Sequence, residues 1–274
     1  MCKKPLILDH DRIVKCGHCI ECLIQRSQEW AFRVEQESKQ WTQGAFITLT
    51  YNDENAIWLV NEDDELLTTL DKRDFQLFMK RLRKKCKKYT DLPLRYFACG
   101  EYGETYNRAH YHLILFNIPN QVKNTLCEVW QKGYVKVGDV TPKSIRYVTN
   151  YMLLKDNKIK KGQSKPFVLM SRRPGLGQAY IKNSAPYHFV TGSPWTQTPG
   201  DRKIPLPKYY FDKIVPEEQQ EEAKQIKIDH YQKFIDEREK EAKEKSPKDP
   251  GEFLRKQKDH KEKIFNHRRK KGTL

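Results

Sequence analysis

The sequence lacks several patterns, and each absence excludes a class of protein. No stretch approaches the roughly 18 consecutive apolar residues that a membrane span needs, so we expect no membrane partner. The opening segment MCKKPLILDHDR has no apolar core, so we also expect no secretory signal. The motif G-x-x-x-x-G-K-[ST] is missing, which excludes a P-loop helicase motor. Internal repeats are missing as well, which excludes a solenoid.

Cysteine is present, but not in the pattern of a disulfide framework. The seven cysteines are an odd number, and three of them lie within residues 16–22. Small secreted domains that depend on disulfides carry an even number of cysteines. We therefore expect the protein to work in a reducing compartment.

The charge balance is strongly basic. The chain has 52 Lys+Arg against 36 Asp+Glu, a formal net charge of +16. Residues 216–274 contribute little of this excess, with 17 basic and 14 acidic residues, and their composition predicts a charged, partly disordered helical tail. Most of the excess therefore lies in residues 1–215, and it predicts a polyanionic partner, most plausibly nucleic acid.

The periodicity of apolar residues predicts an α+β fold. Strands are expected at 45–51, 94–101, 109–116 and 134–140, and helices at 19–41, 71–88, about 120–131 and from Pro142 with Thr141 as N-cap, while 52–70 form a loop or a peripheral hairpin. This order is that of a ferredoxin-like or split-βαβ sandwich, with a central antiparallel sheet and helices on one face. We expect three parts: a Cys-rich arm and helix (1–44), a main domain with a C-terminal extension (45–215) and the tail (216–274).

Two histidines stand in the middle of an apolar strand, in His110-Tyr111-His112. Alternation places both imidazoles on one face of the sheet and Tyr111 on the other, with the two histidine Cα atoms about 6.5–7 Å apart. Their ring nitrogens can therefore reach one metal ion. A buried face gains nothing from two polar rings unless a ligand satisfies them, although similar pairs also occur in other metal and phosphoesterase sites.

A metal ion normally needs a third protein ligand, and the neighbouring strand offers one. If 94–101 pairs antiparallel with 109–116, Glu101 lies opposite the histidine pair, so Glu101 is the first choice. Glu104, in the connecting turn, is the second. Two imidazoles and a carboxylate suit Mn²⁺ better than Mg²⁺, which they still tolerate when phosphate oxygens complete the shell.

Two tyrosines are spaced for one face of a helix. Tyr147 and Tyr151 are four residues apart, and Lys155 continues the same face. Aromatic residues at this spacing are more often packing residues. A phenol can, however, attack a phosphodiester and hold the product covalently, and a nearby lysine can stabilise the developing charge.

A cluster of cysteines near the beginning of the chain is a second candidate metal site. Cys16, Cys19 and Cys22 are three residues apart, and either Cys2 or His18 could complete a set of four. Such a set suits structural Zn²⁺. An iron–sulfur cluster and unligated thiols are the alternatives.

Two groups of basic residues are candidates for contacts with nucleic acid. Arg172 and Arg173 precede a glycine-rich turn that lets the backbone approach a phosphate. Lys80, Arg83 and Lys84 lie on the basic face of the helix at 71–88, which could equally be a solvated surface.

Several motifs occur together and in order, and they carry a resemblance to a known family. FITLTY (46–51), RAHYHLILF (108–116) and YVTNYMLLK (147–155) resemble the conserved blocks of two-tyrosine rolling-circle replication initiators of the His-hydrophobic-His (HUH) endonuclease superfamily. CGHCIEC, GEYG, SRRPGLG and LPKYYFDK further resemble replication initiation proteins of gokushovirus-type microviruses, which are small single-stranded DNA bacteriophages. The resemblance covers most of residues 1–215.

The resemblance implies a nickase that acts at the viral origin, on single-stranded or hairpin DNA, in the cytoplasm of a bacterial host. His110 and His112 would be metal ligands, and Tyr147 and Tyr151 the nucleophiles. One tyrosine would form a 5′-phosphotyrosyl intermediate and leave a 3′-OH for the host polymerase, and the second would allow religation into a circle.

The resemblance also implies further partners. A host helicase would unwind the duplex, and aromatic residues near the metal, such as Tyr102 and Tyr106, would stack on bases. Some phage members have a lysine directly before the second tyrosine, where this chain has Asn150.

Two other functions remain open from the residues alone. One is a non-catalytic, zinc-dependent protein that binds nucleic acid for packaging or regulation. The other is a two-histidine phosphoesterase without a covalent intermediate. Substitution of the histidines separates the first from a nickase, and substitution of both tyrosines separates the second.

Overall fold

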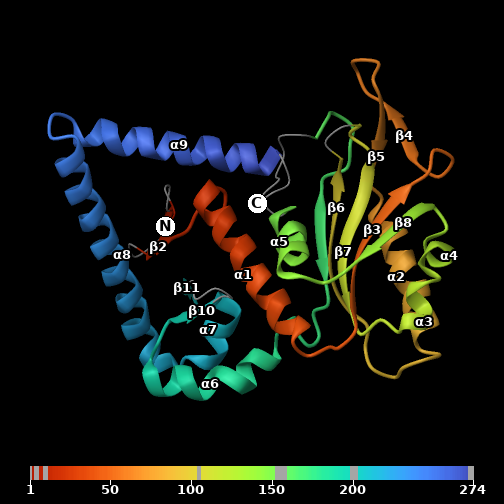
Figure 1. Ribbon diagram of the computed structural model, residues 1–274, viewed down its shortest axis with the longest axis horizontal. Coiled ribbons are helices and arrows are strands. Elements are labelled where there is room, and N and C mark those ends of the chain that lie inside the picture. Colours follow the sequence, from red (N-terminus) through yellow and green to blue (C-terminus); the bar gives the residue numbers. More distant parts are fainter. Residues whose placement is uncertain are drawn as a thin grey trace. The chain divides into compact units, whose positions relative to one another are not determined.

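The computed structural model describes residues 2, 6–8, 12–103, 106–151, 159–197 and 203–270. The chain divides into two compact units, residues 2–178 and residues 179–274 (Figure 1). The first unit contains the histidine and tyrosine motifs. None of the helices in the described ranges combines the length and the apolar character needed to cross a membrane.

A five-stranded antiparallel sheet forms the centre of the first unit, with strand order β8-β3-β7-β6-β9. Its strands are β3 (Gly44–Tyr51), β6 (Arg95–Tyr102), β7 (Ala109–Phe116), β8 (Gly133–Gly138) and β9 (Phe167–Met170). The histidine strand β7 is central, with β3 on one side and β6 on the other. The predicted α+β class and antiparallel sheet are confirmed.

Helices cover both faces of this sheet, rather than the one face predicted (Figure 1). One face carries α2 (Lys72–Cys86), α3 (Asn120–Lys123) and α4 (Leu126–Trp130), and the other carries α1 (Ile20–Ser38) and α5 (Pro142–Asn150). The physical reason lies in the central strands. In β6 and β7 nearly every residue is buried, and a strand that is apolar on both sides requires cover on both sides.

The face under α2 holds the larger core. Phe75, Phe78, Met79 and Leu82, the predicted apolar stripe of this helix, are all buried against the sheet. Each such side chain contributes about 1.5–3 kcal/mol on leaving water. The helix begins where Asp71 accepts a hydrogen bond from the Arg73 N–H, because this cap satisfies a donor that the first turn leaves unpaired.

Short hairpins flank the sheet. The acidic segment 52–70 contains a peripheral hairpin, β4 (Ile57–Val60) with β5 (Leu66–Thr69), which is one of the two forms predicted for it. Near the beginning of the chain, β1 (Leu6–Leu8) pairs with β2 (Arg12–Val14) just before α1.

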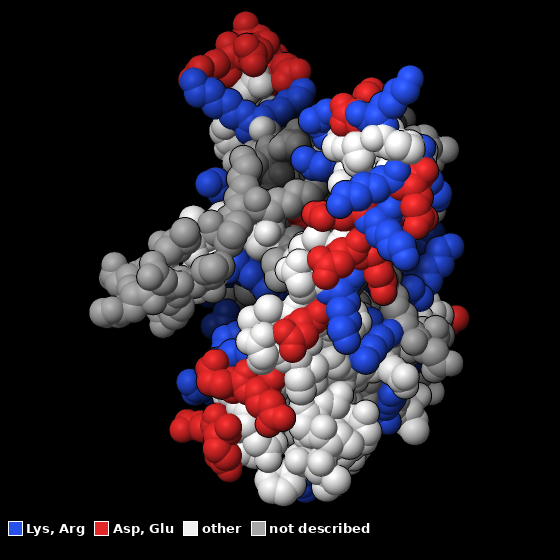
Figure 2. Space-filling model, turned by 90° about the vertical axis from the view of Figure 1, so that its left-hand side faces the viewer, with Lys and Arg blue, Asp and Glu red and all other residues white. Residues whose placement is uncertain are grey.

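The second unit is mainly helical. Its elements are α6 (Ala179–Thr191), β10 (Trp195–Gln197), β11 (Lys203–Pro205), α7 (Lys208–Ile214), α8 (Glu217–Lys245) and α9 (Pro250–Lys270). Basic and acidic side chains are interspersed on the face of the molecule shown in Figure 2. Within α8, pairs such as Lys245 with Glu241 join residues one turn apart, which is typical of a solvated charged helix.

A buried ion pair fastens the end of α1 to the sheet. The Arg95 guanidinium donates to Glu37 at 2.8 Å, and both side chains are almost completely buried. The Gly177 N–H and the Trp41 indole N–H also donate to this carboxylate, at 2.8 and 3.0 Å. Burial alone would raise the pKa of Glu37, but these hydrogen bonds outweigh it, so the pKa lies below its ordinary value.

We expect Glu37→Gln to lower the free energy of unfolding by about 3–5 kcal/mol at neutral pH, because it leaves the Arg95 charge buried and unpaired. The contribution of Glu37 is present above the ordinary carboxyl pKa of about 4.3 and is lost as the pH falls through its depressed folded value. Urea unfolding followed by tryptophan fluorescence tests both statements. Glu35→Gln is the matched control, because burial raises the pKa of Glu35 and its neutral form is already favoured.

Candidate active site

The register of the sheet brings the predicted metal ligands together. Glu101 on β6 lies directly opposite His110 on β7, while Thr48 on β3 lies opposite His112. Both imidazoles are on the face covered by α1 and α5. Tyr111 points to the opposite face, where it packs in the core under α2, as the alternation predicts.

The three side chains converge on one point. His110 Nε2 lies 2.6 Å and His112 Nε2 2.9 Å from the same Glu101 oxygen, Oε1. One potential ligand atom from each residue lies within 4.8 Å of the other two. Glu101 is thus in contact with both histidines, whereas the alternative ligand Glu104 lies outside the described residues.

A second layer of contacts orients the two rings. His110 Nδ1 lies 2.9 Å from the Arg108 carbonyl oxygen, and His112 Nδ1 lies 3.0 Å from Thr48 Oγ1. With each Nδ1 engaged, each Nε2 is turned toward Glu101. Metal-binding histidines are commonly held in this way. Sequence reasoning missed Thr48, although alternation along FITLTY and pairing with the histidine strand could have found it.

The electrostatics of the group favour a cation. Burial would raise the pKa of Glu101, but hydrogen bonds and charge from the two histidines outweigh it, so the pKa is lowered. Burial lowers the pKa of His112. An ionised carboxylate beside a neutral imidazole is a suitable donor set for a divalent transition-metal ion, so the residues present fit the metal that the sequence predicts.

The local sequence explains where the tyrosine helix begins. Thr141 and Ser144 form a reciprocal capping box with Pro142 in the first turn, so α5 begins where the sequence predicts. The helix ends at Asn150, and Tyr151 follows as its C-cap with backbone angles that are still helical. The four-residue spacing therefore keeps Tyr147 and Tyr151 on one side.

Both tyrosines contact the same histidine. The Tyr147 hydroxyl lies 3.5 Å from His112 Nε2. The Tyr151 ring stacks on the His112 ring, with centroids 5.3 Å apart and an interplanar angle of 10°. Burial raises the pKa of Tyr151, and the Glu101 carboxylate raises it further, so deprotonation of this phenol calls for a compensating positive charge. Lys155 lies outside the described residues.

Asn150, between the two tyrosines, connects α5 to α1. The Ser27 hydroxyl donates to Asn150 Oδ1 at 2.7 Å. The position that is lysine in some resembling phage proteins therefore makes a contact between helices in this chain.

The predicted DNA contacts lie on different parts of the first unit. Arg172 and Arg173 are exposed just after β9. Lys80, Arg83 and Lys84 are exposed on α2, which covers the face of the sheet opposite to the histidines. Tyr106 is 87% exposed. The expectation that Tyr102 stacks on bases is wrong, because its ring is buried and its hydroxyl donates to the Ser164 carbonyl at 2.7 Å.

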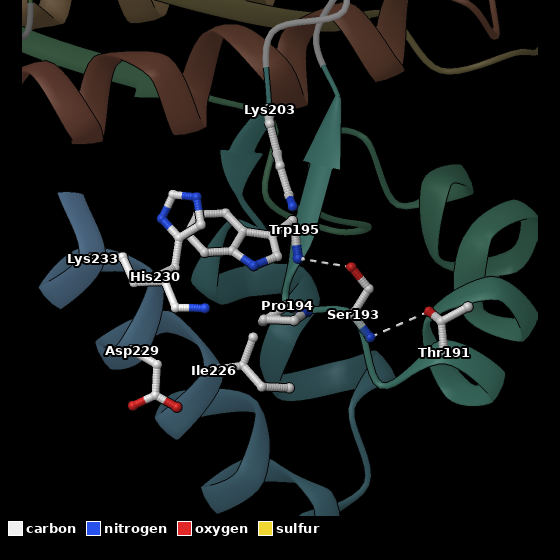
Figure 3. Close-up of a pocket in the computed structure, with 9 residues that line it drawn as sticks. All are labelled: Thr191, Ser193, Pro194, Trp195, Lys203, Ile226, Asp229, His230 and Lys233. Carbon is white, nitrogen blue, oxygen red and sulfur yellow. Dashed lines mark hydrogen bonds between the residues drawn. The ribbon is translucent and has the colours of Figure 1, made fainter. Parts of the chain in front are cut away.

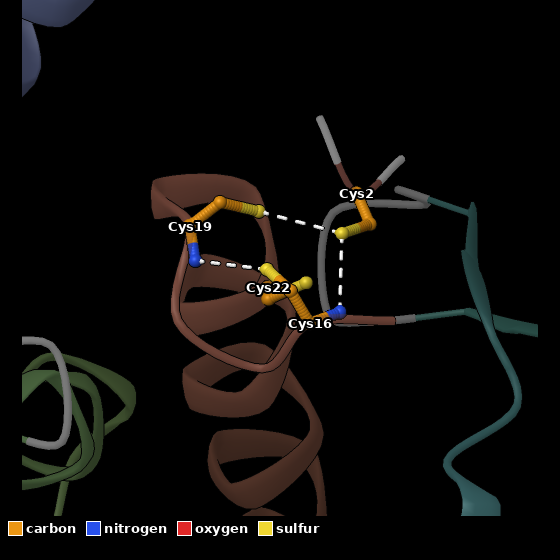
Figure 4. A group of neighbouring side chains, drawn as sticks. All are labelled: Cys2, Cys16, Cys19 and Cys22. Atoms are coloured by element: carbon orange, nitrogen blue, oxygen red, sulfur yellow. Dashed lines mark hydrogen bonds between the residues drawn. The ribbon is translucent and has the colours of Figure 1, made fainter. Parts of the chain in front are cut away.

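The predicted cysteine cluster also comes together. Sγ atoms of Cys2, Cys16, Cys19 and Cys22 all lie within 4.8 Å of one another (Figure 4). The fourth member is Cys2 rather than the His18 ring.

A pocket in the second unit has a different composition. Its volume is about 470 Å³, and Trp195, His230 and Lys203 are among the residues that line it (Figure 3). The His230 ring lies 4.7 Å from the Trp195 ring, and Lys203 Nζ lies 5.3 Å from it. Because the lining lacks a convergent set of ligands, this pocket is less suited to phosphoryl transfer than the group in the first unit.

We expect Thr48→Val to weaken divalent-metal binding by about 10–100-fold, because it removes the hydroxyl that orients His112 and keeps the shape of the side chain. Titration of Mn²⁺ by calorimetry measures this effect. Thr50→Val is the matched control on the same strand, opposite His110, whose Nδ1 contacts a backbone carbonyl instead. Equal affinity in the Thr48 variant and the wild type would contradict the orienting role.

Comparisons with known proteins agree with this geometry. The family model of the phage replication-associated protein ORF2 matches residues 44–156, the segment that contains the histidine strand and both tyrosines. The chain is 30% identical over 238 residues to replication-associated protein ORF2 of Spiroplasma virus 4, covering 76% of this chain and 69% of that protein.

Two further phage proteins are similar. Replication-associated protein VP4 of Bdellovibrio phage phiMH2K is 29% identical over 221 residues, covering 72% of this chain and 66% of that protein, just under two thirds of its length. Replication-associated protein ORF4 of Chlamydia phage 1 is 26% identical over 156 residues, covering 50% of this chain and 37% of that protein. The chain therefore belongs to the family of replication-associated proteins of microvirus-type phages.

Proposed function

We propose that this protein initiates rolling-circle replication by nicking one DNA strand at the viral origin. The observation that carries the proposal is the contact of both tyrosines with His112, a member of the Glu101–His110–His112 group. Nucleophile candidates and metal ligands thus lie within reach of one phosphate. Membership of a family of phage replication-associated proteins supports the same conclusion.

The chemistry follows from the groups at this site. A Mn²⁺ or Mg²⁺ ion held by Glu101, His110 and His112 would polarise the scissile phosphate and offset its developing charge. The phenol oxygen of one tyrosine attacks phosphorus, and the bond from phosphorus to the 3′ oxygen breaks. The phenol loses its proton, and the departing oxygen takes one up to become a 3′-OH. The product is a 5′-phosphotyrosyl linkage, which conserves the energy of the phosphodiester.

Two adjacent tyrosines allow the reaction to be completed. The host polymerase extends the 3′-OH while a host helicase unwinds the duplex. When the origin has been copied, the second tyrosine cleaves it in the same way. The newly released 3′-OH then attacks the first phosphotyrosine, which closes a circle and frees the first phenol. The 5.0 Å between the Tyr147 and Tyr151 rings supports alternate use of one site.

Incubation with labelled single-stranded origin DNA and Mn²⁺ tests the proposal. We expect a labelled protein band on a denaturing gel, and mass spectrometry of the digested adduct to find the nucleotide on Tyr147 or Tyr151. Cleavage without an adduct would instead indicate a phosphoesterase that uses water, and binding without cleavage a packaging or regulatory protein.

The basic surface of the first unit should determine how binding depends on salt. We expect the affinity for a single-stranded oligonucleotide to fall steeply with salt concentration, and Arg172→Ala with Arg173→Ala to reduce the salt slope by about 1–2. Fluorescence anisotropy at several salt concentrations measures the slope. The matched comparison is Arg83→Ala with Lys84→Ala on α2, which should weaken binding but leave nicking of bound DNA unchanged. An unchanged slope in the Arg172 and Arg173 variant would contradict their contact with phosphate.

A further inference from the structure

We propose that Cys2, Cys16, Cys19 and Cys22 bind one structural Zn²⁺ ion, and that this ion fixes the beginning of α1, the helix that supports the tyrosine helix. The first part is independent of the nickase. The second rests on the proposed function, because it concerns the positions of Tyr147 and Tyr151.

The spacing of the sulfur atoms fits a single metal ion. Cys2 Sγ and Cys19 Sγ lie 3.8 Å apart. A disulfide would require about 2.05 Å. Four thiolates placed tetrahedrally around Zn²⁺ at about 2.3 Å are about 3.8 Å apart along each edge. The whole group of four sulfurs stays within 4.8 Å, which leaves room for one ion rather than for a cluster of several irons.

The surrounding backbone favours thiolates. Cys16 Sγ accepts hydrogen bonds from the His18 and Cys19 N–H groups at 3.5 and 3.3 Å, and Cys2 Sγ accepts from the Cys16 N–H at 3.2 Å. Cys19 is the N-cap of α1, and its side chain makes no capping bond to the helix. Its thiol is turned toward the other three instead (Figure 4). The positive end of the helix dipole adds to the preference for negative charge.

Ordinary packing does not explain this arrangement. Cys2, Cys16 and Cys19 are only partly buried, whereas a cysteine that serves as a small apolar core residue is usually fully buried, as Cys99 is here. Cys2 also precedes the β1–β2 hairpin, so the chain returns across this hairpin to bring it to the other three. A purely sulfur donor set in tetrahedral spacing selects Zn²⁺ over Mg²⁺ or Mn²⁺.

The site lies at one end of a helix that contacts the tyrosine helix along its length. From Cys19 onward, α1 reaches Ser27, whose hydroxyl donates to Asn150 at 2.7 Å. Ala31 and Val34 then share a buried cluster with residues of α5, against which Tyr147 and Tyr151 pack. Freeing the first turn of α1 therefore loosens the support of both nucleophiles.

Metal analysis of the full-length protein tests the zinc site directly. We expect about one zinc ion per chain by inductively coupled plasma mass spectrometry, reduced at least tenfold by Cys2→Ser or Cys19→Ser. Cys127→Ser, at an exposed cysteine on α4, should retain it. A variant with His110→Ala and His112→Ala should also retain it, which separates this ion from any metal at the histidines. Absence of zinc in the wild type, iron in its place, or zinc retained by Cys2→Ser would overturn the proposal.

Hydrogen exchange and nicking test the coupling. We expect the Cys19→Ser variant to exchange faster in the first turns of α1 and in α5, while the amides of β7 remain protected, which shows that the domain is folded. Formation of the covalent adduct should slow by on the order of 10²-fold, because misplaced nucleophiles lose alignment. A zinc-free variant that nicks at the wild-type rate would overturn the coupling. Zinc content is measured without DNA, so it is decided independently of whether the protein is a nickase.

Discussion

A variant carrying both Tyr147→Phe and Tyr151→Phe will form no covalent complex with single-stranded origin DNA, and its nicking will fall by roughly 10⁴-fold or more. The substitutions remove the only two phenols among the described residues that contact His112. They keep the aromatic rings that pack against the core on this face. The measurement is the yield of labelled adduct on a denaturing gel, with circular dichroism to check the fold.

The matched control for this double variant is Tyr89→Phe with Tyr134→Phe. Both of these tyrosines are more than half exposed, and they make the same chemical change away from the histidines. The control should form the adduct like the wild type. Persistence of a full-yield adduct in the Tyr147 and Tyr151 variant would show that another residue is the nucleophile.

The single variants distinguish cleavage from joining. With one phenol left, at least one of Tyr147→Phe and Tyr151→Phe should still form the adduct, because both rings contact the same imidazole. Neither should release closed circles, because a second cleavage needs a second nucleophile. The variant that keeps adduct formation identifies the tyrosine that acts first.

Local signals predicted most of the site. The strand alternation in His110-Tyr111-His112 determines which side chains share a face, and the capping signal at Thr141 determines where α5 begins; both depend on neighbours in the sequence. Glu101 was reachable because a short turn joins its strand to the histidine strand, so their register is nearly fixed. These features required no knowledge of the tertiary structure.

The features that sequence reasoning missed depend on contacts between distant segments. Thr48 orients His112 across 64 residues of sequence, and Glu37 pairs with Arg95 across 58. Nothing near either residue marks its role, because both look like ordinary positions in a strand and a helix. The cover on both sides of the sheet was missed for a related reason, since the helices that pack on the two faces of 109–116 come from distant parts of the chain.

The second large effect concerns the metal ligands. We expect His112→Ala to slow adduct formation by roughly 10³-fold, corresponding to about 4 kcal/mol of lost transition-state stabilisation. His112 is the ring that contacts Glu101, Thr48 and both tyrosines, so its loss removes a ligand and the support of the nucleophiles together. His260→Ala, at an exposed position on α9, is the matched control and should react like the wild type.

His110→Gln separates the loss of a ligand from the loss of structure. Its ring is more accessible than that of His112, with 15% of the side chain exposed against 6%. If it is a metal ligand, the variant needs more Mn²⁺ to reach half-maximal adduct formation, and high Mn²⁺ restores much of the rate. If its role is structural, no concentration of Mn²⁺ restores the rate. A wild-type response of His110→Gln to Mn²⁺ would remove His110 from the ligand set and leave Glu101 and His112 without the third donor on which the proposed chemistry depends.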